Sequence, residues 1–356
     1  MLYCKKLIIN THNILKILII LTLVNFLMYF NLYSQISSGG YSESYLLRDV
    51  GARHVSLCGA YSGISNDPMT IFYNPAGLAY LSDRPVVSTM VSVLEFNRTH
   101  SAIAWGQSFF ENFGFGFAIN SFNTGSFTAR DIRGNPLGDY SNWQFDIVAG
   151  ASYNIEFASV GVALKYLSNS LQGSGTGADG ISLDIGTKFN VYDIFSFGLS
   201  VQNASSYLSW NTPSDEYTML PYTIRTGVAM EYGLNNDVYE TRNTVTGETE
   251  EIVEPASRYI LFAIDAVLSQ HDNGPSIILG IEAVPHEIIA FRGGISLAGD
   301  DLGEWKLFPM NIWGGGVSIR PDFSDLPFKF SVDYSISSDH ISVNKIGHHI
   351  ALTFEF

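Results

Sequence analysis

The sequence has few charged residues, and positive charge is especially scarce. Asp, Glu, Lys and Arg make up 15% of the 356 residues, whereas soluble domains average roughly 25%. There are 19 Lys and Arg against 34 Asp and Glu, and the cations form no basic stripe. The protein is therefore a poor partner for nucleic acid and for anionic membrane surfaces.

Cysteine is almost absent, which limits redox chemistry. Cys4 lies in a basic N-terminal region, and Cys58 is the only other cysteine. Once that N-terminal region is removed, Cys58 has no partner for an intramolecular disulfide. Its neighbours in "SLCGA" are small and mainly apolar, so we expect a buried spectator rather than a reactive thiol.

Long apolar runs are missing except at the N-terminus. Residues 1–34 carry three lysines and no acid, with the apolar run "ILIILTLVNFLMYF" at 17–30 and the small residue Ser34 as a cleavage position. This pattern predicts a secretory signal peptide, the alternative being an uncleaved anchor. Further along, no segment of about 18 residues is both uncharged and mainly apolar, so we expect no spanning helix.

The rest of the chain is rich in short alternating runs. In "FGFGFAI" (113–119), large apolar residues alternate with Gly and Ala, and in "FKFSVDYSI" (328–336) they alternate with Lys, Ser and Asp. A period of two indicates strands. A soluble β-sandwich would leave more charge on its outer faces, whereas an outer-membrane barrel turns its apolar face to lipid and its polar face to the lumen. The pattern favours the barrel.

The alternation predicts about fourteen strands between residues 85 and 356, an even number, as bacterial single-chain barrels have. The fold class is therefore all-β, a transmembrane antiparallel β-barrel with short turns at one end and longer loops at the other. Residues 233–256 are long and acidic where a short turn is due. We expect a hairpin projecting into the periplasm there, the alternative being a miscounted pair of strands. The expected strands cover 85–95, 98–109, 112–122, 141–153, 157–169, 178–190, 195–203, 221–232, 257–268, 275–285, 288–297, 310–320, 326–337 and 346–356.

Two helix-start signals lie seven residues apart before the first strand. Asp67-Pro68 and Asn74-Pro75 each place a side-chain acceptor before a proline, which is the N-cap and first position of a helical turn. Gly77 then allows a left-handed stop. Both turns are therefore expected to be short.

Residues 35–84, which contain these turns, are too apolar for a disordered tail. A fourteen-stranded barrel has a lumen too wide for its own wall side chains to fill. We therefore expect this segment to fold inward as an N-terminal plug, or hatch, with residues 71–73 against the wall. The alternative is a periplasmic cap beside the barrel.

The C-terminal strand "HHIALTFEF" ends on alternating aromatic residues, Phe354 and Phe356. This ending resembles the recognition signal by which the outer-membrane insertion machinery takes up its barrels. His348 and His349 point to opposite faces of one strand, so we expect no joint metal site.

Nothing in the sequence favours an enzyme, and we predict no metal and no cofactor. "GSGTGADG" (173–180) lacks the Gly-Lys-Ser/Thr ending of a phosphate loop. Several charged residues fall on the inward face of the expected strands, where we expect them to compensate one another or to hold the hatch. These residues are Lys165, Asp184, Lys188, Arg225, Asp265, Glu282, Arg292 and Asp333.

The stretch 51–79, "GARHVSLCGAYSGISNDPMTIFYNPAGLA", resembles the N-terminal signature of the PorV/PorQ family, which is itself similar to FadL-type long-chain fatty-acid channels. The resemblance implies a fourteen-stranded barrel with an N-terminal hatch in the outer membrane of a Gram-negative-type bacterium. The family usually has an acid where this chain has Asn66. The matching positions are Gly51, Ala52, Arg53, Gly59, Ala60, Asp67, Pro68, Asn74, Pro75, Ala76, Gly77 and Leu78.

The resemblance implies two functions, and we expect the first. PorV-like members are type IX secretion system components that bind and carry the C-terminal domains of secreted cargo, for which Tyr207 and Trp210, in an expected loop, would be partner-binding anchors. The alternative is a FadL-like channel for hydrophobic compounds such as long-chain fatty acids. A channel needs an apolar pocket and a kinked wall strand. The glycines at 314–316 could form such a kink, or they could make room for the hatch.

Overall fold

A computed structural model describes residues 43–356 of the chain. Within this range it leaves out 111, 156, 192–193, 213–216, 236–237, 243–248, 254–255, 271–274, 298–311, 322, 324–325 and 340–341. The predicted signal peptide 1–34 and the first residues of the predicted hatch lie outside the described residues. No helix in the described part is long and apolar enough to cross a membrane.

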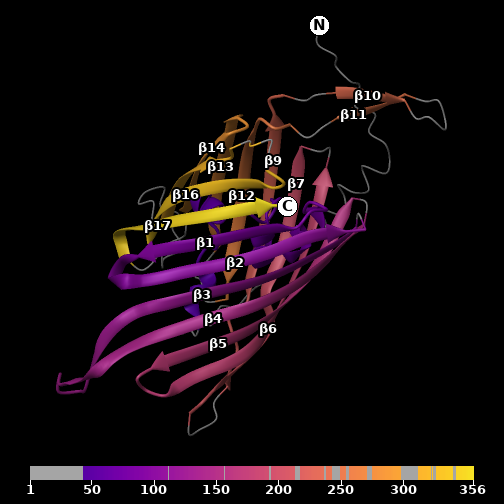
Figure 1. Cartoon of the computed structure of the whole chain (residues 1–356). Helices are drawn as coiled ribbons and strands as arrows, with labels where there is room; N and C mark the ends of the chain where they lie inside the picture. Colours follow the sequence, from indigo (N-terminus) through magenta and orange to yellow (C-terminus); the bar gives the residue numbers. More distant parts are fainter. Residues whose placement is uncertain are drawn as a thin grey trace. The chain divides into compact units, whose positions relative to one another are not determined.

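Fourteen antiparallel strands form a closed barrel (Figure 1). Neighbours in the sheet are neighbours in sequence, and the last strand pairs with the first over Val86–Glu355 to Val93–His348. Every predicted strand is present, which confirms the all-β barrel. The strands are β1 (Val86–Leu94), β2 (Arg98–Phe109), β3 (Phe113–Arg130), β4 (Pro136–Ile155), β5 (Ala158–Gln172), β6 (Thr176–Val191), β7 (Phe195–Trp210), β9 (Thr223–Gly233), β12 (Tyr259–Ser269), β13 (Ser276–His286), β14 (Ile289–Leu297), β15 (Ile312–Ile319), β16 (Lys329–Asp339) and β17 (Ser342–Glu355).

The two faces of the wall have the chemistry expected of an outer-membrane barrel. On β3, Phe113, Phe115 and Phe117 are 42–45% exposed on the outside, whereas the residues between them are buried. On β5, Val162 and Leu164 face outward in the same way. An apolar outer face suits lipid, and closure leaves no unpaired edge in the hydrocarbon region. The architecture is that of an outer-membrane barrel and not of a soluble sandwich.

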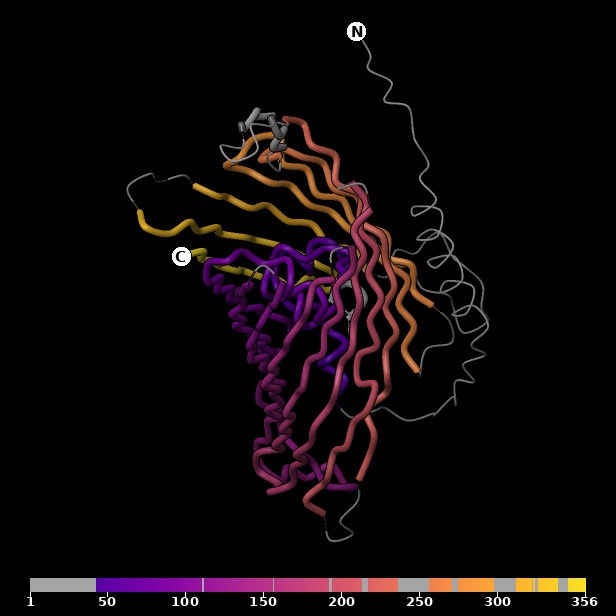
Figure 2. Tube along the Cα trace, turned by 90° about the vertical axis from the view of Figure 1, so that its right-hand side faces the viewer, coloured from indigo at the N-terminus to yellow at the C-terminus, as the bar shows by residue number. Residues whose placement is uncertain are grey.

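Two predicted loops are partly strand. β3 and β4 continue to Arg130 and from Pro136, so most of the expected loop 123–140 is a hairpin. β7 continues to Trp210 because it stays paired with β6 past a bulge. Strands β3 to β7 have 15–20 residues and reach farther than those near the C-terminus (Figure 2).

The acidic segment 233–256 forms the predicted hairpin. Its strands β10 (Val238–Arg242) and β11 (Thr249–Val253) pair only with each other, as a sheet separate from the wall. They are therefore not a miscounted pair of wall strands. The β-structure is completed by β8 (Tyr217–Thr218), which pairs with β7.

Residues 43–81, named the inner segment here, make their contacts with inward-facing side chains of the wall. The segment contains η1 (Ser44–Leu47), α2 (Ala52–Ser56), η2 (Pro68–Phe72) and η3 (Pro75–Tyr80). Tyr61, Met69 and Leu78 within it are fully buried. The bounds 35–84 and a plugging role remain predictions.

Wall glycines let the inner segment approach closely. β15 pairs with both neighbours without a register shift among its described residues, so the pairing shows no bulge at 314–316 and favours the second interpretation of these glycines. A Cβ on Gly314 would lie 2.3 Å from the carbonyl oxygen of Val55, and one on Gly294 would lie 2.4 Å from the carbonyl carbon of Leu57. These glycines make room for α2 and the turn that follows it.

We expect Gly294→Ala to loosen the inner segment without preventing barrel formation. The added methyl group would displace the backbone at Leu57, whereas a Cβ on its neighbour Gly293 would meet nothing closer than 3.9 Å. Limited proteolysis of the membrane-embedded protein should then cut between residues 43 and 81 faster in Gly294→Ala than in the control Gly293→Ala. Equal cutting in the two variants would contradict the assigned contact.

Candidate functional site

The two helix starts in the inner segment are capped as predicted. The Asp67 carboxylate accepts a hydrogen bond from the backbone N–H of Met69 at 2.8 Å. The Asn74 side-chain oxygen accepts one from the N–H of Ala76 at 3.2 Å. Prolines occupy the first helical position in both cases, where a missing N–H costs nothing. These interactions are local, so the sequence alone revealed them.

Asn74 also ties the turn to the wall. Its amide nitrogen donates to the carbonyl oxygens of Ser62 and Thr187, each at 3.0 Å, and Thr187 is a residue of β6. Ser159 of β5 donates to the carbonyl oxygen of Ala76 at 2.9 Å. Residues 74–76 are therefore held both by their own cap and by two wall strands.

Gly77 does not end η3, so the predicted left-handed stop is wrong. The helix continues to Tyr80, and Gly77 is not among the glycines with positive φ. A Cβ here would lie 2.3 Å from the Thr70 hydroxyl oxygen. Close packing of η3 on η2, rather than backbone conformation, requires glycine. The positive φ expected of a turn glycine instead occurs at Gly51 and Gly59, with φ of 99° and 80°.

Asp265 on β12 binds the backbone of the inner segment. One of its carboxylate oxygens accepts hydrogen bonds from the N–H groups of Tyr61 and Ser62 at 3.1 and 2.9 Å, and from the Ser62 hydroxyl. Arg225 on β9 donates to the carbonyl oxygen of Gly59 at 2.6 Å. The wall thus satisfies polar backbone groups of a segment that forms no sheet and little helix.

A buried ionic cluster joins α2 to four wall strands. Arg53 contacts both carboxylate oxygens of Glu282 at 2.8 and 2.9 Å. Arg292 pairs with the same carboxylate and with Asp333, and the Tyr259 hydroxyl donates to Glu282. Two cations meet two anions with several charge-assisted hydrogen bonds, which offsets the cost of burying them. This cluster is built to hold α2, and it leaves no free acid and base pair for catalysis.

The remaining inward-facing charged residues also pair with each other or bind the inner segment. Lys165 pairs with Asp184 at 2.7 Å, and Lys188 donates to Ser65 of the inner segment. All eight charged residues expected on the inner face are buried. The prediction that they compensate one another or hold the N-terminal segment is confirmed. In the described ranges, no cluster of three or more His, Cys, Asp or Glu could hold a metal ion.

His54 stays uncharged beside this cluster. Its ring stacks on Tyr73 at 4.8 Å and lies 3.8 Å from the ring of Tyr61. Burial, together with the nearby guanidinium of Arg53, holds the pKa of His54 well below its ordinary range. Neither ring nitrogen has a hydrogen-bond partner among the described residues, so His54 acts as an aromatic packing residue.

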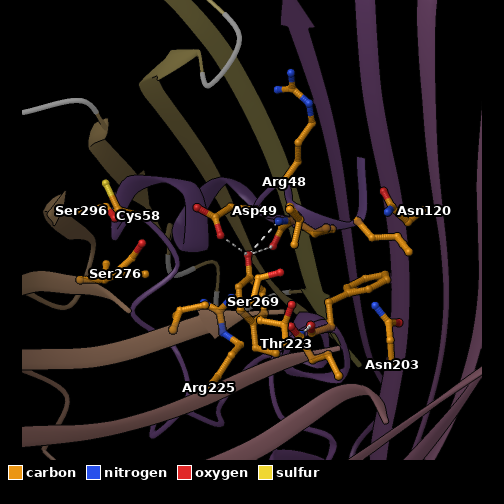
Figure 3. A pocket seen from close by; sticks show the side chains of 18 of the residues that line it. Arg48, Asp49, Cys58, Asn120, Asn203, Thr223, Arg225, Ser269, Ser276 and Ser296 are labelled. Atoms are coloured by element: carbon orange, nitrogen blue, oxygen red, sulfur yellow. Dashed lines mark hydrogen bonds between the residues drawn. The ribbon is translucent and has the colours of Figure 1, made fainter. Parts of the chain in front are cut away.

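A cavity of about 230 Å³ lies between the inner segment and the wall (Figure 3). Polar and apolar side chains both line it, since the inner segment contributes mainly apolar groups and the wall contributes polar and apolar groups. Ser276, Ser296 and Cys58 lie together on one side, and Asn120 and Asn203 lie on the other. The apolar lining includes Leu46, Leu47, Val50, Phe72, Val267 and Ile278.

A second cavity of about 690 Å³ lies at the other side of the inner segment, near the turns β13–β14 and β15–β16. Charged groups dominate its lining, including Arg53, Arg292, Arg320 and Lys329. Among described residues the two cavities share no lining residue. The inner segment and its ionic cluster therefore separate a mixed chamber from a charged one.

The predicted partner-binding residues do not lie on a free loop. Tyr207 and Trp210 belong to β7, where Tyr207 stacks on Tyr217 at 5.8 Å and the Trp210 indole N–H donates to Thr218 at 3.1 Å. Both residues pack on the wall and on β8. Their loop placement was wrong because the β6–β7 ladder extends beyond the bulge.

The side chains of the C-terminal strand point to the predicted faces of the wall. The Phe354 ring lies 6.0 Å from the ring of Phe328, and Phe356 is 51% exposed. His348 contacts Tyr334 on the outer face, whereas His349 is buried and hydrogen-bonds Ser92 at 2.7 Å. The two histidines are therefore on opposite faces, as expected. A role for Phe354 and Phe356 in assembly remains a prediction.

Solved structures with the same barrel are hydrocarbon transporters and a FadL homologue. The CymD monoaromatic hydrocarbon channel is 12% identical, with a TM-score of 0.54, and the match covers 87% of this chain and 98% of that one. The Pseudomonas putida toluene transporter TodX is 11% identical, with a TM-score of 0.53 and the same coverage. A Pseudomonas aeruginosa FadL homologue is 9% identical, with a TM-score of 0.53, covering 86% of this chain and 98% of its own.

These similarities establish a FadL-like barrel fold and no more, because sequence identity is low. No protein-family model matches the sequence, and no curated protein matches it. None of the three structures named above is a PorV or PorQ protein, so the finer resemblance stays a prediction.

Removing the central carboxylate should test the ionic cluster. Glu282→Gln leaves two buried guanidinium groups facing one carboxylate, and breaking a buried pair costs about 3–5 kcal/mol. We expect the free energy of unfolding, measured by urea titration in lipid vesicles, to fall by that order. The exposed pair of Glu95 and Lys345, 3.5 Å apart, provides the control, since Glu95→Gln should cost about 1 kcal/mol or less. Equal losses would argue against a structural role for the cluster.

The start of the inner segment should anchor less firmly as pH rises. Glu43 accepts hydrogen bonds from Asn169 and Gln144, and burial, aided by the Asp146 charge, raises the pKa of Glu43 to about 7. The folded state therefore holds this proton more tightly than the unfolded state. The contribution of Glu43 to the free energy of unfolding is therefore fully present below about pH 4.5. It is lost as pH rises through about 7.

Urea titrations at pH 5 and pH 8 measure this effect. Glu43→Gln should shrink the stability difference between the two pH values, because the titrating group is gone. The control Glu95→Gln should keep the difference of the parent protein. A difference unchanged by Glu43→Gln would show that other groups cause it.

Proposed function

We propose that the protein is an outer-membrane channel for the uptake of small hydrophobic compounds. The observation that carries this proposal is the partly apolar cavity between the inner segment and the wall. A lumen crossed by a buried segment does not suit a water-filled pore, but it suits a ligand that is bound during passage. The solved structures that share the fold include hydrocarbon channels and a toluene transporter, which supports this reading and fits a protein that is not an enzyme.

A wall irregularity beside the cavity supports the same function. The register between β6 and β7 shifts between Leu183 and Ile185, and Asn203 of β7 adopts a positive φ of 53°. Its N–H turns inward to the Asp184 carboxylate at 2.8 Å. Pairing of β7 with β9 reaches only Gln202, and past the bulge β7 pairs with β6 and β8 instead. A bulge changes the direction of the strand at this point of the wall. Asn203, at the bulge, also lines the cavity.

The type IX secretion role receives no comparable support. Its expected anchors, Tyr207 and Trp210, pack on the wall and on β8. No other described contact points to a cargo domain. Secreted cargo, secretion-system proteins, the insertion machinery and outer-membrane lipid stay predicted partners.

Straightening the bulge should impair uptake. Asn tolerates a left-handed conformation whereas a β-branched residue does not, so Asn203→Val should flatten β7 at a strain of about 1–3 kcal/mol. We expect accumulation of radiolabelled toluene in cells that express this variant to fall severalfold below the parent. Ser205→Val makes the same kind of change at an exposed position of the same strand and should leave uptake intact.

Heat-modifiable mobility on gels should first confirm equal amounts of folded barrel. Uptake by the parent no greater than in cells lacking the protein would overturn the channel proposal. Co-purification of secreted cargo domains with the parent would then favour the secretion role.

A further inference from the structure

We propose that the 230 Å³ cavity is a binding site for a small neutral amphiphile, with an apolar body about the size of one ring and one hydroxyl-like hydrogen-bonding group. This inference rests on the proposed function and specifies its substrate class. Three observations support it. They are the size of the cavity, the presence of apolar and hydroxyl groups side by side in its lining, and the contacts that its charged side chains already make.

The size of the cavity favours a small ligand over a long acyl chain. Sites for drug-sized ligands occupy about 300–1,000 Å³, and the cavity here has about 230 Å³. An engineered apolar cavity of about 150 Å³ binds benzene. By proportion, this one holds about nine non-hydrogen atoms, which is one ring with a short substituent. Long-chain fatty acids, part of the alternative function drawn from the sequence, are therefore disfavoured at this site.

The lining offers an apolar contact and hydrogen-bonding groups side by side. Ile278 is 6% exposed and, with Val267, lines the cavity on β13 and β12. Ser276 and Ser296 stand next to them on β13 and β14. Neither serine hydroxyl hydrogen-bonds another described residue. By contrast, the Asn203 side chain is occupied by Lys165, Ser182 and the carbonyl oxygen of Pro221. The two serines, together with Thr223, whose buried hydroxyl also has no hydrogen-bond partner among the described residues, are thus the groups available to a ligand hydroxyl.

The charges at the cavity are already engaged, which disfavours an anionic ligand. Lys165 pairs with Asp184 at 2.7 Å. Arg225 donates to Gly59, and its guanidinium lies 5.1 Å from the ring centroid of Tyr73. A carboxylate would have to break these contacts, which also hold the inner segment. A pure hydrocarbon is also disfavoured, because it would leave the serine hydroxyls without hydrogen bonds.

Calorimetric titration of the full-length protein in lipid nanodiscs tests this ligand class. The probes are benzyl alcohol, toluene, benzoate and palmitate. Benzyl alcohol should bind roughly fivefold more tightly than toluene, the effect of one net hydrogen bond. Benzoate and palmitate should bind at least tenfold more weakly than benzyl alcohol. Equal affinity for benzyl alcohol and toluene, or tighter binding of either acid, would overturn the proposal.

Two variants locate the site within the barrel. Ile278→Phe fills the cavity and should reduce benzyl alcohol affinity at least tenfold. Ile281→Phe makes the same change on the lipid-facing side of β13, where Ile281 is 44% exposed, and should have no effect. The double change Ser276→Ala and Ser296→Ala should reduce the preference for benzyl alcohol over toluene. Unchanged preference in the double variant, or equal effects of the two Phe variants, would place binding elsewhere.

The outcomes separate this inference from the channel function. Uptake of toluene by cells without the expected preference in titrations would leave the channel standing and reject the substrate class. Selective binding of benzyl alcohol without any uptake would do the reverse.

Discussion

The width of a fourteen-stranded barrel is the constraint on which the rest of this structure depends. An eight-stranded barrel is filled by its own wall side chains, but a lumen of this size is not. The inner segment packs against the inward face of the wall, with Tyr61, Met69 and Leu78 fully buried. Wall glycines admit its backbone, as Gly114 does at Leu78. Small residues at these inward positions thus complement the N-terminal segment, while large apolar residues such as Phe113, Phe115 and Phe117 are exposed on the outer face.

Packing of the inner segment against the wall is accompanied by buried charge. The helices of the inner segment have only four to six residues, so most of their backbone groups have no partner within a helix. The wall provides those partners, as Asp265 does for the N–H groups of Tyr61 and Ser62. Buried carboxylates are costly unless they are hydrogen-bonded, and the backbone of the inner segment donates two hydrogen bonds to one oxygen of Asp265. Each side therefore satisfies the polar groups of the other.

Local and periodic features were predictable from the sequence, and long-range pairings were not. All fourteen strands followed from alternation, since lipid on one face and lumen on the other impose a period of two. The caps at Asp67 and Asn74 followed from neighbouring residues. The pairing of Arg53 with Glu282 spans 229 positions, and eight inward charges allow many such pairs. Gly77 was misread because the close approach of the Thr70 side chain leaves no local signal in the sequence.

The cavity lies between the inner segment and the wall, and the contacts that hold the inner segment also determine the chemistry of its lining. Its polar lining would bind water in the absence of a ligand, and a ligand has to replace the hydrogen bonds of that water. Arg225 lines the cavity and also holds the Gly59 carbonyl, so a ligand that attracts Arg225 strongly would weaken the anchor of the inner segment. A neutral compound avoids this conflict. Retention of the inner segment and choice of ligand are therefore governed by the same side chains.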